Sequence, residues 1–153
     1  MKKFFSFLLL LGTLAQAAMF QTVEPHQTKL LQKGDNARYC NSCGMDLVLF
    51  YKTSHAAKVN GKTKQFCSMH CLAETMQKVK NITDIKVVDA KSLKWIDAKK
   101  AYYVVGSRVK GTMSRTSKYA FKNLSDAKEF QRLRGGKIMT FNQALEIAKK
   151  DFQ

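Results

Sequence analysis

The chain has 153 residues, a length that fits one compact domain or two small halves. Its composition, 45% hydrophobic and 25% charged, is ordinary for a globular protein and excludes an intrinsically disordered chain. Lys and Arg number 27 against 11 Asp and Glu, so the formal net charge is +16. The single Pro and eight Gly exclude collagen-like and proline-rich chains.

The first 17 residues predict a cleavable secretory signal peptide. Met1-Lys2-Lys3 is a short positive start, residues 4–11 are almost entirely apolar, and Ala15-Gln16-Ala17 is a small-x-small cleavage signal. The apolar stretch is too short to remain as a membrane-spanning helix. We therefore expect export and cleavage after Ala17. In an oxidising compartment, each cysteine must be paired, bound to metal or kept reduced for a purpose.

Residues 18–37 are polar and carry the only proline, so we expect an extended lead-in. A first half follows, over about residues 38–92. A helix is predicted from an N-cap at Ser68 through Lys80, and Asn60-Gly61 predicts a tight hairpin turn. We expect the apolar run 47–51 to pair with the strand after it. The predicted strands of this half are residues 47–51, 55–59, 62–67 and 84–89.

The second half, over about residues 93–153, shows a similar order of elements. Gly135-Gly136 should end its first helix, and a second helix is expected at the C-terminus. The predicted strands are residues 102–105, 119–121 and 138–139, and the predicted helices lie around 125–134 and over 141–150. Strands grouped between single helices indicate an α+β fold with two similar small units packed together.

All four cysteines fall in the first half. They form a C-x-x-C pair and a C-x-x-x-C pair, and Met45 and His70 lie close to them in sequence. Such clustering indicates one site built from soft ligands. The cysteines are Cys40, Cys43, Cys67 and Cys71.

Several chemistries fit these thiols. Disulfide exchange is disfavoured, because a thioredoxin-like C-x-x-C begins a helix whereas Gly44 and a β-like run follow Cys43. Four thiolates from a turn and a helix start suit tetrahedral zinc. Copper(I) prefers thiolate and thioether sulfur, and Cys43-Gly44-Met45 supplies both. Two structural disulfides are a fourth interpretation, which an oxidising compartment favours.

Two further side chains have open roles. Met113 lies on an expected exposed loop after a strand. Composition alone favours a structural role, in which the Met113 side chain folds back and fills a gap in the core. His70 stands between two thiols and is either a ligand or an ordinary surface residue.

The span from Cys40 to about residue 139 resembles the NosL family, the accessory proteins of nitrous oxide reductase. The resemblance covers about two thirds of the chain. Its longest part is the tryptophan- and tyrosine-containing segment of residues 95–107. The points of resemblance are Cys40-x-x-Cys43-Gly44-Met45, residues 95–107, Gly111-Thr112-Met113, residues 126–130 and residues 135–138.

The resemblance implies a periplasmic copper(I) chaperone rather than an enzyme, built from two ββαβ-like units with a C-terminal helix. It implies Cys43, Met45 and Met113 as copper ligands, with Cys43 first among them. It implies a copper-accepting client, nitrous oxide reductase or its maturation factors. This sequence differs from the family in lacking a lipobox cysteine.

A second difference is the added pair of Cys67 and Cys71, which resembles the TRASH-type metal-binding pattern. With Cys40, these residues would form a second soft site or a disulfide near the first. The alternative function is therefore a zinc- or disulfide-stapled heavy-metal-binding or interaction module that does not deliver copper.

The other function classes are less well supported. The chain has no Ser/His/Asp signature, P-loop or dinucleotide fingerprint, so we expect no catalytic turnover. The basic charge is spread along an exported chain, which argues against nucleic-acid binding. Such a surface still favours docking to an acidic partner or peripheral contact with membrane headgroups.

Overall fold

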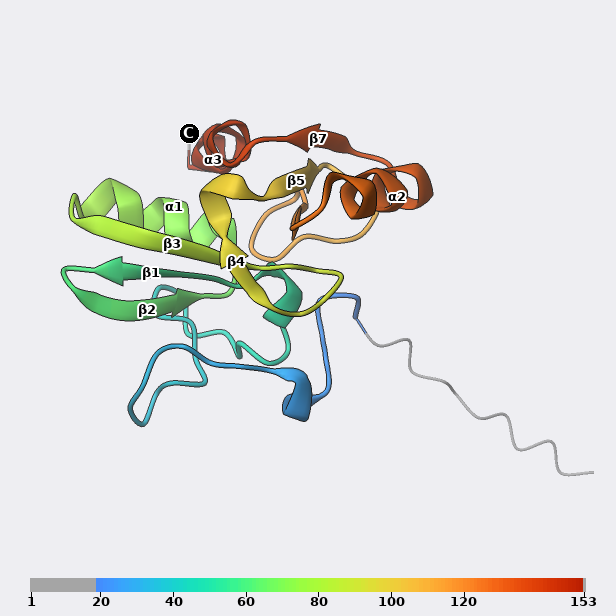
Figure 1. Cartoon of the computed structure of the whole chain (residues 1–153). Helices are drawn as coiled ribbons and strands as arrows, with labels where there is room; N and C mark the ends of the chain where they lie inside the picture. Colours follow the sequence, from blue (N-terminus) through green and yellow to red (C-terminus); the bar gives the residue numbers. More distant parts are fainter. Residues whose placement is uncertain (1–18, 153) are drawn as a thin grey trace, which may run out of the picture.

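Two antiparallel sheets form the body of the protein in a computed structural model that describes residues 19–152 (Figure 1). The first has the strand order β2-β1-β3-β4 and the second the order β6-β5-β7. The predicted signal peptide, residues 1–17, lies outside the described residues. Within the described part, no helix combines the length and apolar character needed to cross a membrane.

The elements follow one another in two similar series. The first series is β1 (His55–Val59), β2 (Lys62–Phe66), α1 (Met69–Lys78), β3 (Ile82–Val88) and β4 (Trp95–Asp97). The second is β5 (Tyr102–Val105), β6 (Lys118–Phe121), α2 (Leu124–Arg134), β7 (Lys137–Met139) and α3 (Phe141–Lys150). Three short 3-10 helices are η1 (Pro25–Gln27), η2 (Tyr51–Thr53) and η3 (Ala98–Lys100).

Both series therefore contain a ββαβ unit, and the predicted α+β fold is confirmed. In each unit the first strand lies at the centre, between the second and the third. Strand β4 adds to the edge of the first sheet by pairing with β3. A parallel bridge between Asp89 and Ala120 joins the two units.

The local signals explain where the elements begin and end. Asn60 and Gly61 have φ angles of 50° and 79°, so they form the predicted two-residue turn between β1 and β2. The Ser68 side chain accepts a hydrogen bond from the Cys71 N–H and caps α1 as expected. Gly135, at φ 75°, ends α2.

The predicted strand over residues 47–51 is wrong. The carboxylate of Asp46 accepts hydrogen bonds from Val48 N (2.8 Å) and Leu49 N (3.4 Å), which bend the chain into turns that lead to η2. Strand β1 pairs instead with β2 and β3. Leu47 and Val48 are nevertheless buried, so the apolar run correctly indicated burial but not conformation.

The main hydrophobic core is shared by both units. Helices α1 and α3 pack against each other, and the largest buried cluster contains side chains from both sheets. Burying such side chains is the dominant favourable contribution to folding. Central members of the cluster are Phe66, Leu72, Tyr103, Phe141 and Ala144.

The lead-in before the first unit contains η1 and two short turns, at residues 20–21 and 35–38, and is held against the body of the protein. Trp95 donates its indole N–H to Lys29 O at 2.7 Å. Gln65 accepts from Leu31 N at 2.9 Å through its side chain, and its own N–H donates to the Gln32 side chain at 2.8 Å. Gln21 and Gln32 are both buried.

A buried polar pair connects the units in the core. His55 is 1% exposed, with Nδ1 3.0 Å from Thr53 O and Nε2 3.2 Å from the Tyr103 hydroxyl. A carbonyl oxygen only accepts, so Nδ1 carries the proton and Nε2 accepts from Tyr103. Burial, aided by the charge of Lys118, lowers the pKa of His55 to about 4.

We expect the free energy of unfolding to fall as the pH is lowered from about 6.5 towards about 4. In this window the unfolded chain binds a proton at His55 that the folded protein does not, with a slope of at most about 1.4 kcal/mol per pH unit. Urea denaturation at pH 7 and pH 5 measures this loss. His55→Gln, which cannot titrate, should show a smaller loss; an equal loss would contradict the assignment.

Candidate metal centre

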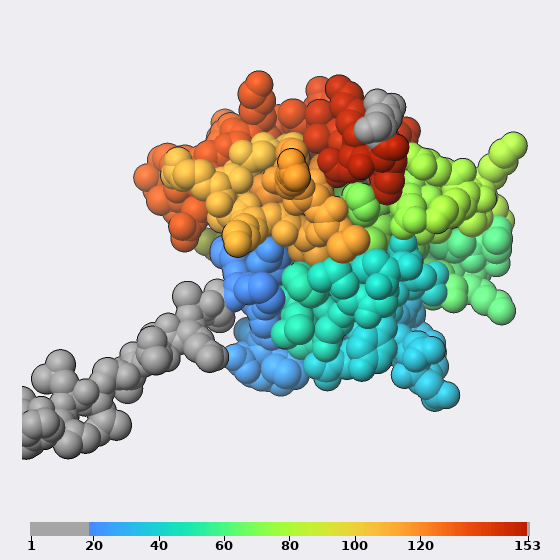
Figure 2. All heavy atoms as spheres, turned by 180° about the vertical axis from the view of Figure 1, so that it is seen from behind, coloured from blue at the N-terminus to red at the C-terminus, as the bar shows by residue number. Residues whose placement is uncertain are grey.

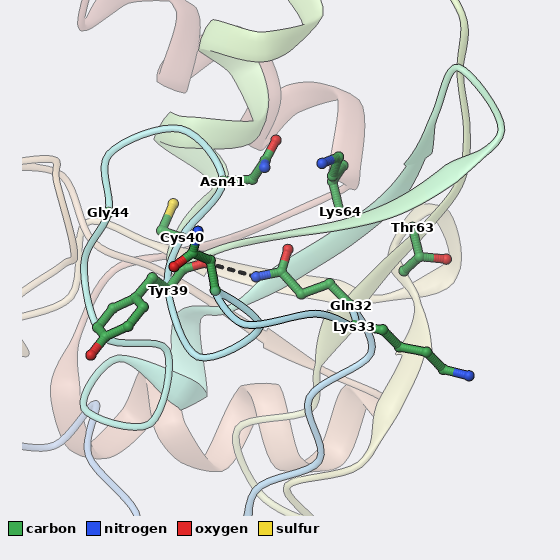
Figure 3. Close-up of a pocket in the computed structure, with 9 residues that line it drawn as sticks. Gln32, Lys33, Tyr39, Cys40, Asn41, Gly44, Thr63 and Lys64 are labelled. Atoms are coloured by element: carbon green, nitrogen blue, oxygen red, sulfur yellow. Dashed lines mark hydrogen bonds between the residues drawn. The ribbon is translucent and has the colours of Figure 1, made fainter.

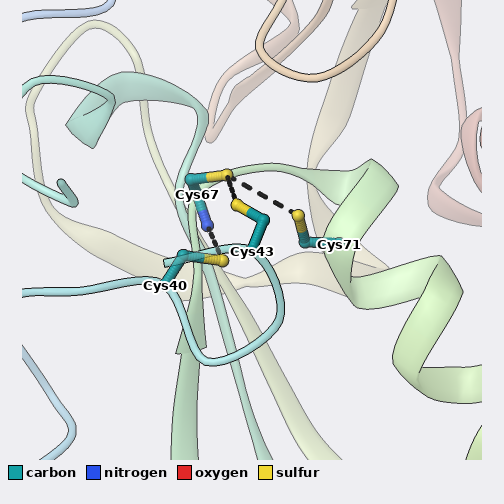
Figure 4. A group of neighbouring side chains, drawn as sticks. All are labelled: Cys40, Cys43, Cys67 and Cys71. Atoms are coloured by element: carbon teal, nitrogen blue, oxygen red, sulfur yellow. Dashed lines mark hydrogen bonds between the residues drawn. The ribbon is translucent and has the colours of Figure 1, made fainter. Parts of the chain in front are cut away.

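The four cysteines form a single cluster, although they come from three parts of the chain (Figure 4). Their Sγ atoms all lie within 4.8 Å of one another. The Sγ of Cys67 is 3.5 Å from that of Cys43 and 3.7 Å from that of Cys71. All four are free thiols, so the structure contains neither of the disulfides considered above. We call Cys40, Cys43, Cys67 and Cys71 the cysteine cluster.

A tight loop presents the first pair. Cys40 N donates to Met45 O (2.8 Å), and Gly44 N donates to Cys40 O (2.9 Å). Gly44 has φ 77°, a conformation that a side chain disfavours, so glycine is needed between Cys43 and Met45. The C-G-M motif thus places its thiol and its thioether on one closed turn.

Backbone contacts hold this loop against the end of β2. Asn41 N donates to Gln65 O at 2.9 Å, and Cys67 N donates to the Cys40 sulfur at 3.3 Å. Cys67 directly follows β2, and Cys71 lies in the first turn of α1, whose start is fixed by Ser68. The strand-to-helix junction therefore turns the second pair back towards the first.

The cluster is polarised. Hydrogen bonds from Cys67 and Cys71 hold the pKa of Cys40 well below its usual range. The same interactions with Cys40, together with burial, raise the pKa of Cys67 and the pKa of Cys71. Ionisation is thus favoured at Cys40 over Cys67 and Cys71, and a bound cation would compensate the buried negative charge of further thiolates.

The arrangement fits a soft metal ion. The sulfur separations of 3.5 and 3.7 Å are close to the edge of about 3.8 Å expected for a tetrahedron with metal–sulfur bonds of about 2.3 Å. Thiolates also suit copper(I). Cys40, Cys67 and Cys71 are buried, whereas Cys43 is exposed. The cluster is therefore closed on the protein side and open at Cys43.

The two methionines singled out from the sequence lie in different surroundings. Met45 is half-buried and packs against the main core. Met113 is 44% exposed and lies on the loop of residues 106–117, here called the Met113 loop. Thr112, next to Met113, is hydrogen-bonded to Thr53 at 2.8 Å, and Thr53 donates to Cys67 O at 2.7 Å. The Met113 loop is therefore connected to the cysteine cluster.

His70 faces another direction. Its Nδ1 is 3.6 Å from an Asp151 carboxylate oxygen, and its ring lies 4.4 Å from that of Phe152, centroid to centroid. Among the described residues, the group of close metal-ligating atoms contains the four cysteines without His70. His70 therefore lies on α1 between two thiols in sequence, but its side chain contacts the C-terminal end of the chain.

A polar pocket of about 480 Å³ opens beside Cys40 (Figure 3). Gln32 forms one wall and donates to Tyr39 O at 2.7 Å. Lys33 and Lys64 line the pocket, and no acidic side chain does. Its charge therefore complements a negatively charged partner.

Known proteins resemble this chain in sequence and in fold. The NosL family model matches residues 32–147. The chain belongs to the NosL family. A curated member, the copper-binding lipoprotein NosL of Stutzerimonas stutzeri, is 32% identical over 115 residues, which cover 68% of this chain and 60% of that protein. The chain thus spans about three fifths of that relative's length.

A solved structure shows the same fold. The crystal structure of the copper chaperone NosL from Shewanella denitrificans superposes with a TM-score of 0.59. It is 23% identical, and the match covers 75% of this chain and 96% of that chain. The NosL fold, expected from the sequence, is confirmed.

Sequence reasoning missed Thr53 and Gln21, which contact the Met113 loop. Gln21 donates its side-chain amide to Lys110 O (2.9 Å) and Gly111 O (3.2 Å). No local pattern marks either residue, because each contact joins segments far apart in the chain.

In the reduced, metal-free protein we expect Cys43 to be alkylated before the other three cysteines. It is the exposed thiol of the cluster, and reagent access limits the reaction of the buried ones. Brief iodoacetamide treatment followed by peptide mass spectrometry gives the order. Faster labelling of Cys40, Cys67 or Cys71 than of Cys43 would contradict the closed side of the cluster.

Proposed function

We propose that the protein is an exported copper(I) chaperone that passes its ion to a periplasmic copper enzyme. The observation that carries this is a cluster of four sulfurs within 4.8 Å, with one exposed thiol, in a member of the NosL family. The names of its relatives, a copper-binding lipoprotein and a copper chaperone, support copper as the cargo.

Copper(I) would be held by Cys43, Met45 and Met113. The Cys43 thiolate supplies negative charge, and the thioethers bind without losing a proton. Exposure of Cys43 and Met113 leaves an edge of the site open to solvent. A ligand of the acceptor can then attack at that edge, so the ion passes by exchange and is never released free.

The three buried thiols of Cys40, Cys67 and Cys71 lie behind this site. Cys67 is 3.5 Å from Cys43, sulfur to sulfur, so it is close enough to share or stabilise the same ion. With a thiolate favoured at Cys40, the buried side offers negative charge that attracts a cation towards the cluster. His70 would act only if its ring turned away from Asp151.

The client we propose is nitrous oxide reductase or one of its maturation factors. Residues 1–17 support export to the periplasm. The excess of Lys and Arg, including the two lysines beside Cys40, supports encounter with an acidic partner and peripheral contact with membrane headgroups. Delivery of metal requires no chemical turnover, which is consistent with a protein that is not an enzyme.

A second candidate is a structural zinc site. It is favoured by the sulfur separations of 3.5 and 3.7 Å, which suit four thiolates around one tetrahedral ion. Zinc would then stabilise the junction of the first loop with β2 and α1, and the protein would act as an interaction module.

An anaerobic titration of the reduced mature protein with copper(I), against a competing chelator and with zinc in parallel, tests the proposal. We expect tight one-to-one copper(I) binding that outcompetes zinc. Tight zinc binding through all four thiolates with weak copper(I) binding would overturn the proposal in favour of the structural site.

Cys43→Ser should weaken copper(I) binding by about 100-fold or more, because a hard hydroxyl replaces a soft thiolate. Ser42→Ala is the matched control: Ser42 is exposed on the same loop, and its hydroxyl contacts Glu74 rather than the cysteine cluster. Unchanged affinity in Cys43→Ser would contradict the assignment of Cys43.

A further inference from the structure

The Met113 loop lacks regular structure but is fixed at several points. Lys118 Nζ donates to Ser114 Oγ (3.1 Å) and Thr116 O (2.9 Å). A Cβ atom at Gly111 would lie 2.9 Å from both Ser114 O and Ser117 Cα, so the loop folds closely upon itself. Thr112 and Ser117 are buried within it.

One threonine connects this loop to the cysteine cluster. Thr53 is 3% exposed, and its Oγ1 lies 2.7 Å from Cys67 O and 2.8 Å from Thr112 Oγ1. The Thr53 hydroxyl is the donor in both contacts, so its single proton is shared between Cys67 O and Thr112 Oγ1. The Thr53 side chain thus joins the backbone of Cys67 to the residue that precedes Met113.

A glutamine from the lead-in holds the other side. Gln21 is 4% exposed, and its two amide protons reach the carbonyls of Lys110 and Gly111. The backbone carbonyl of Gln21 accepts a hydrogen bond from Lys52 N at 3.1 Å. Gln21 is therefore bonded to the residue before Thr53. Figure 2 shows the blue N-terminal segment directly against the orange Met113 loop and the teal segment that contains Thr53.

Met113 itself has an unusual backbone for an exposed residue. Its φ is 57°, in the left-handed region, which costs a non-glycine residue free energy and persists only where the surroundings impose it. Thr112 and Ser114, on either side of it, line a small cavity together with Ser68 and His70. The loop is therefore set against the chain that carries Cys67 and Cys71.

We propose that Gln21 and Thr53 are positioning residues that fix the Met113 loop against the cysteine cluster, so that the Met113 thioether is pre-set for copper(I). This rests on the proposed function, in which Met113 is a ligand. A loop held in its binding conformation loses less conformational freedom when the ion arrives, so the ligand contributes more affinity.

The test is a double-mutant cycle measured by copper(I) competition. In the wild-type protein, Met113→Ala should weaken copper(I) binding by about ten-fold, as expected for losing one ligand of several. In a Thr53→Val background, which keeps the side-chain shape but removes the hydroxyl, the same change should cost less than about three-fold. Gln21→Leu should reduce the effect in the same direction.

Two controls separate positioning from general structure. Thr53→Ser retains the hydroxyl and should restore the full effect of Met113→Ala. Thr75 donates to Cys71 O at 2.9 Å without touching the Met113 loop, so Thr75→Val should leave the ten-fold effect intact. Amide hydrogen exchange of residues 110–116 in the metal-free protein should accelerate in Thr53→Val and Gln21→Leu, but not in Thr75→Val.

The outcomes distinguish the two proposals. No effect of Met113→Ala in the wild-type protein would overturn the assignment of Met113 as a ligand, and this inference with it. A full effect that persists in both Thr53→Val and Gln21→Leu, with unchanged amide exchange, would overturn the positioning role alone. If Thr53→Val does not fold, Gln21→Leu gives the decision by the same two readouts.

Discussion

The site depends on the contact that closes the loop of Cys40 onto the end of β2. Two backbone donors make it: Asn41 N bonds Gln65 O, and Cys67 N bonds the sulfur of Cys40. These bonds hold the first cysteine pair beside the second. With them, the four thiols occupy one small volume, where a bound cation would offset the negative charge that their ionisation creates.

Local chemistry made much of the fold predictable. The Asn60-Gly61 turn, the Ser68 cap and the glycine at the end of α2 act over a few residues, so the sequence shows them directly. Residues 47–51 do not form the predicted strand, because the carboxylate of Asp46 accepts hydrogen bonds from backbone N–H groups that a strand would use. The candidate thiols were predictable as a group from their spacing. That they form one cluster, with Cys43 alone exposed, depends on tertiary contacts.

The long-range contacts at the site were not predictable. Thr53 and Thr112 are separated by 59 positions, and Gln21 and Lys110 by 89. Hydroxyl and amide side chains of this kind are common on any surface, and only the folded chain shows that these are buried and shared. The position of the His70 side chain was not predictable for the same reason. Cysteines lie close to His70 in sequence, but its side chain contacts Asp151 and Phe152.

The two units have the same strand order, and the Met113 loop occupies in the second the place that the Asn60-Gly61 turn occupies in the first. It is a longer hairpin connection, and it reaches the neighbouring unit through Thr112 and Thr53. Such a connection can change in length and composition while the strands on either side keep their pairing. A change in this one connection would therefore alter the contact between the two units, with the sheets and the thiols left as they are.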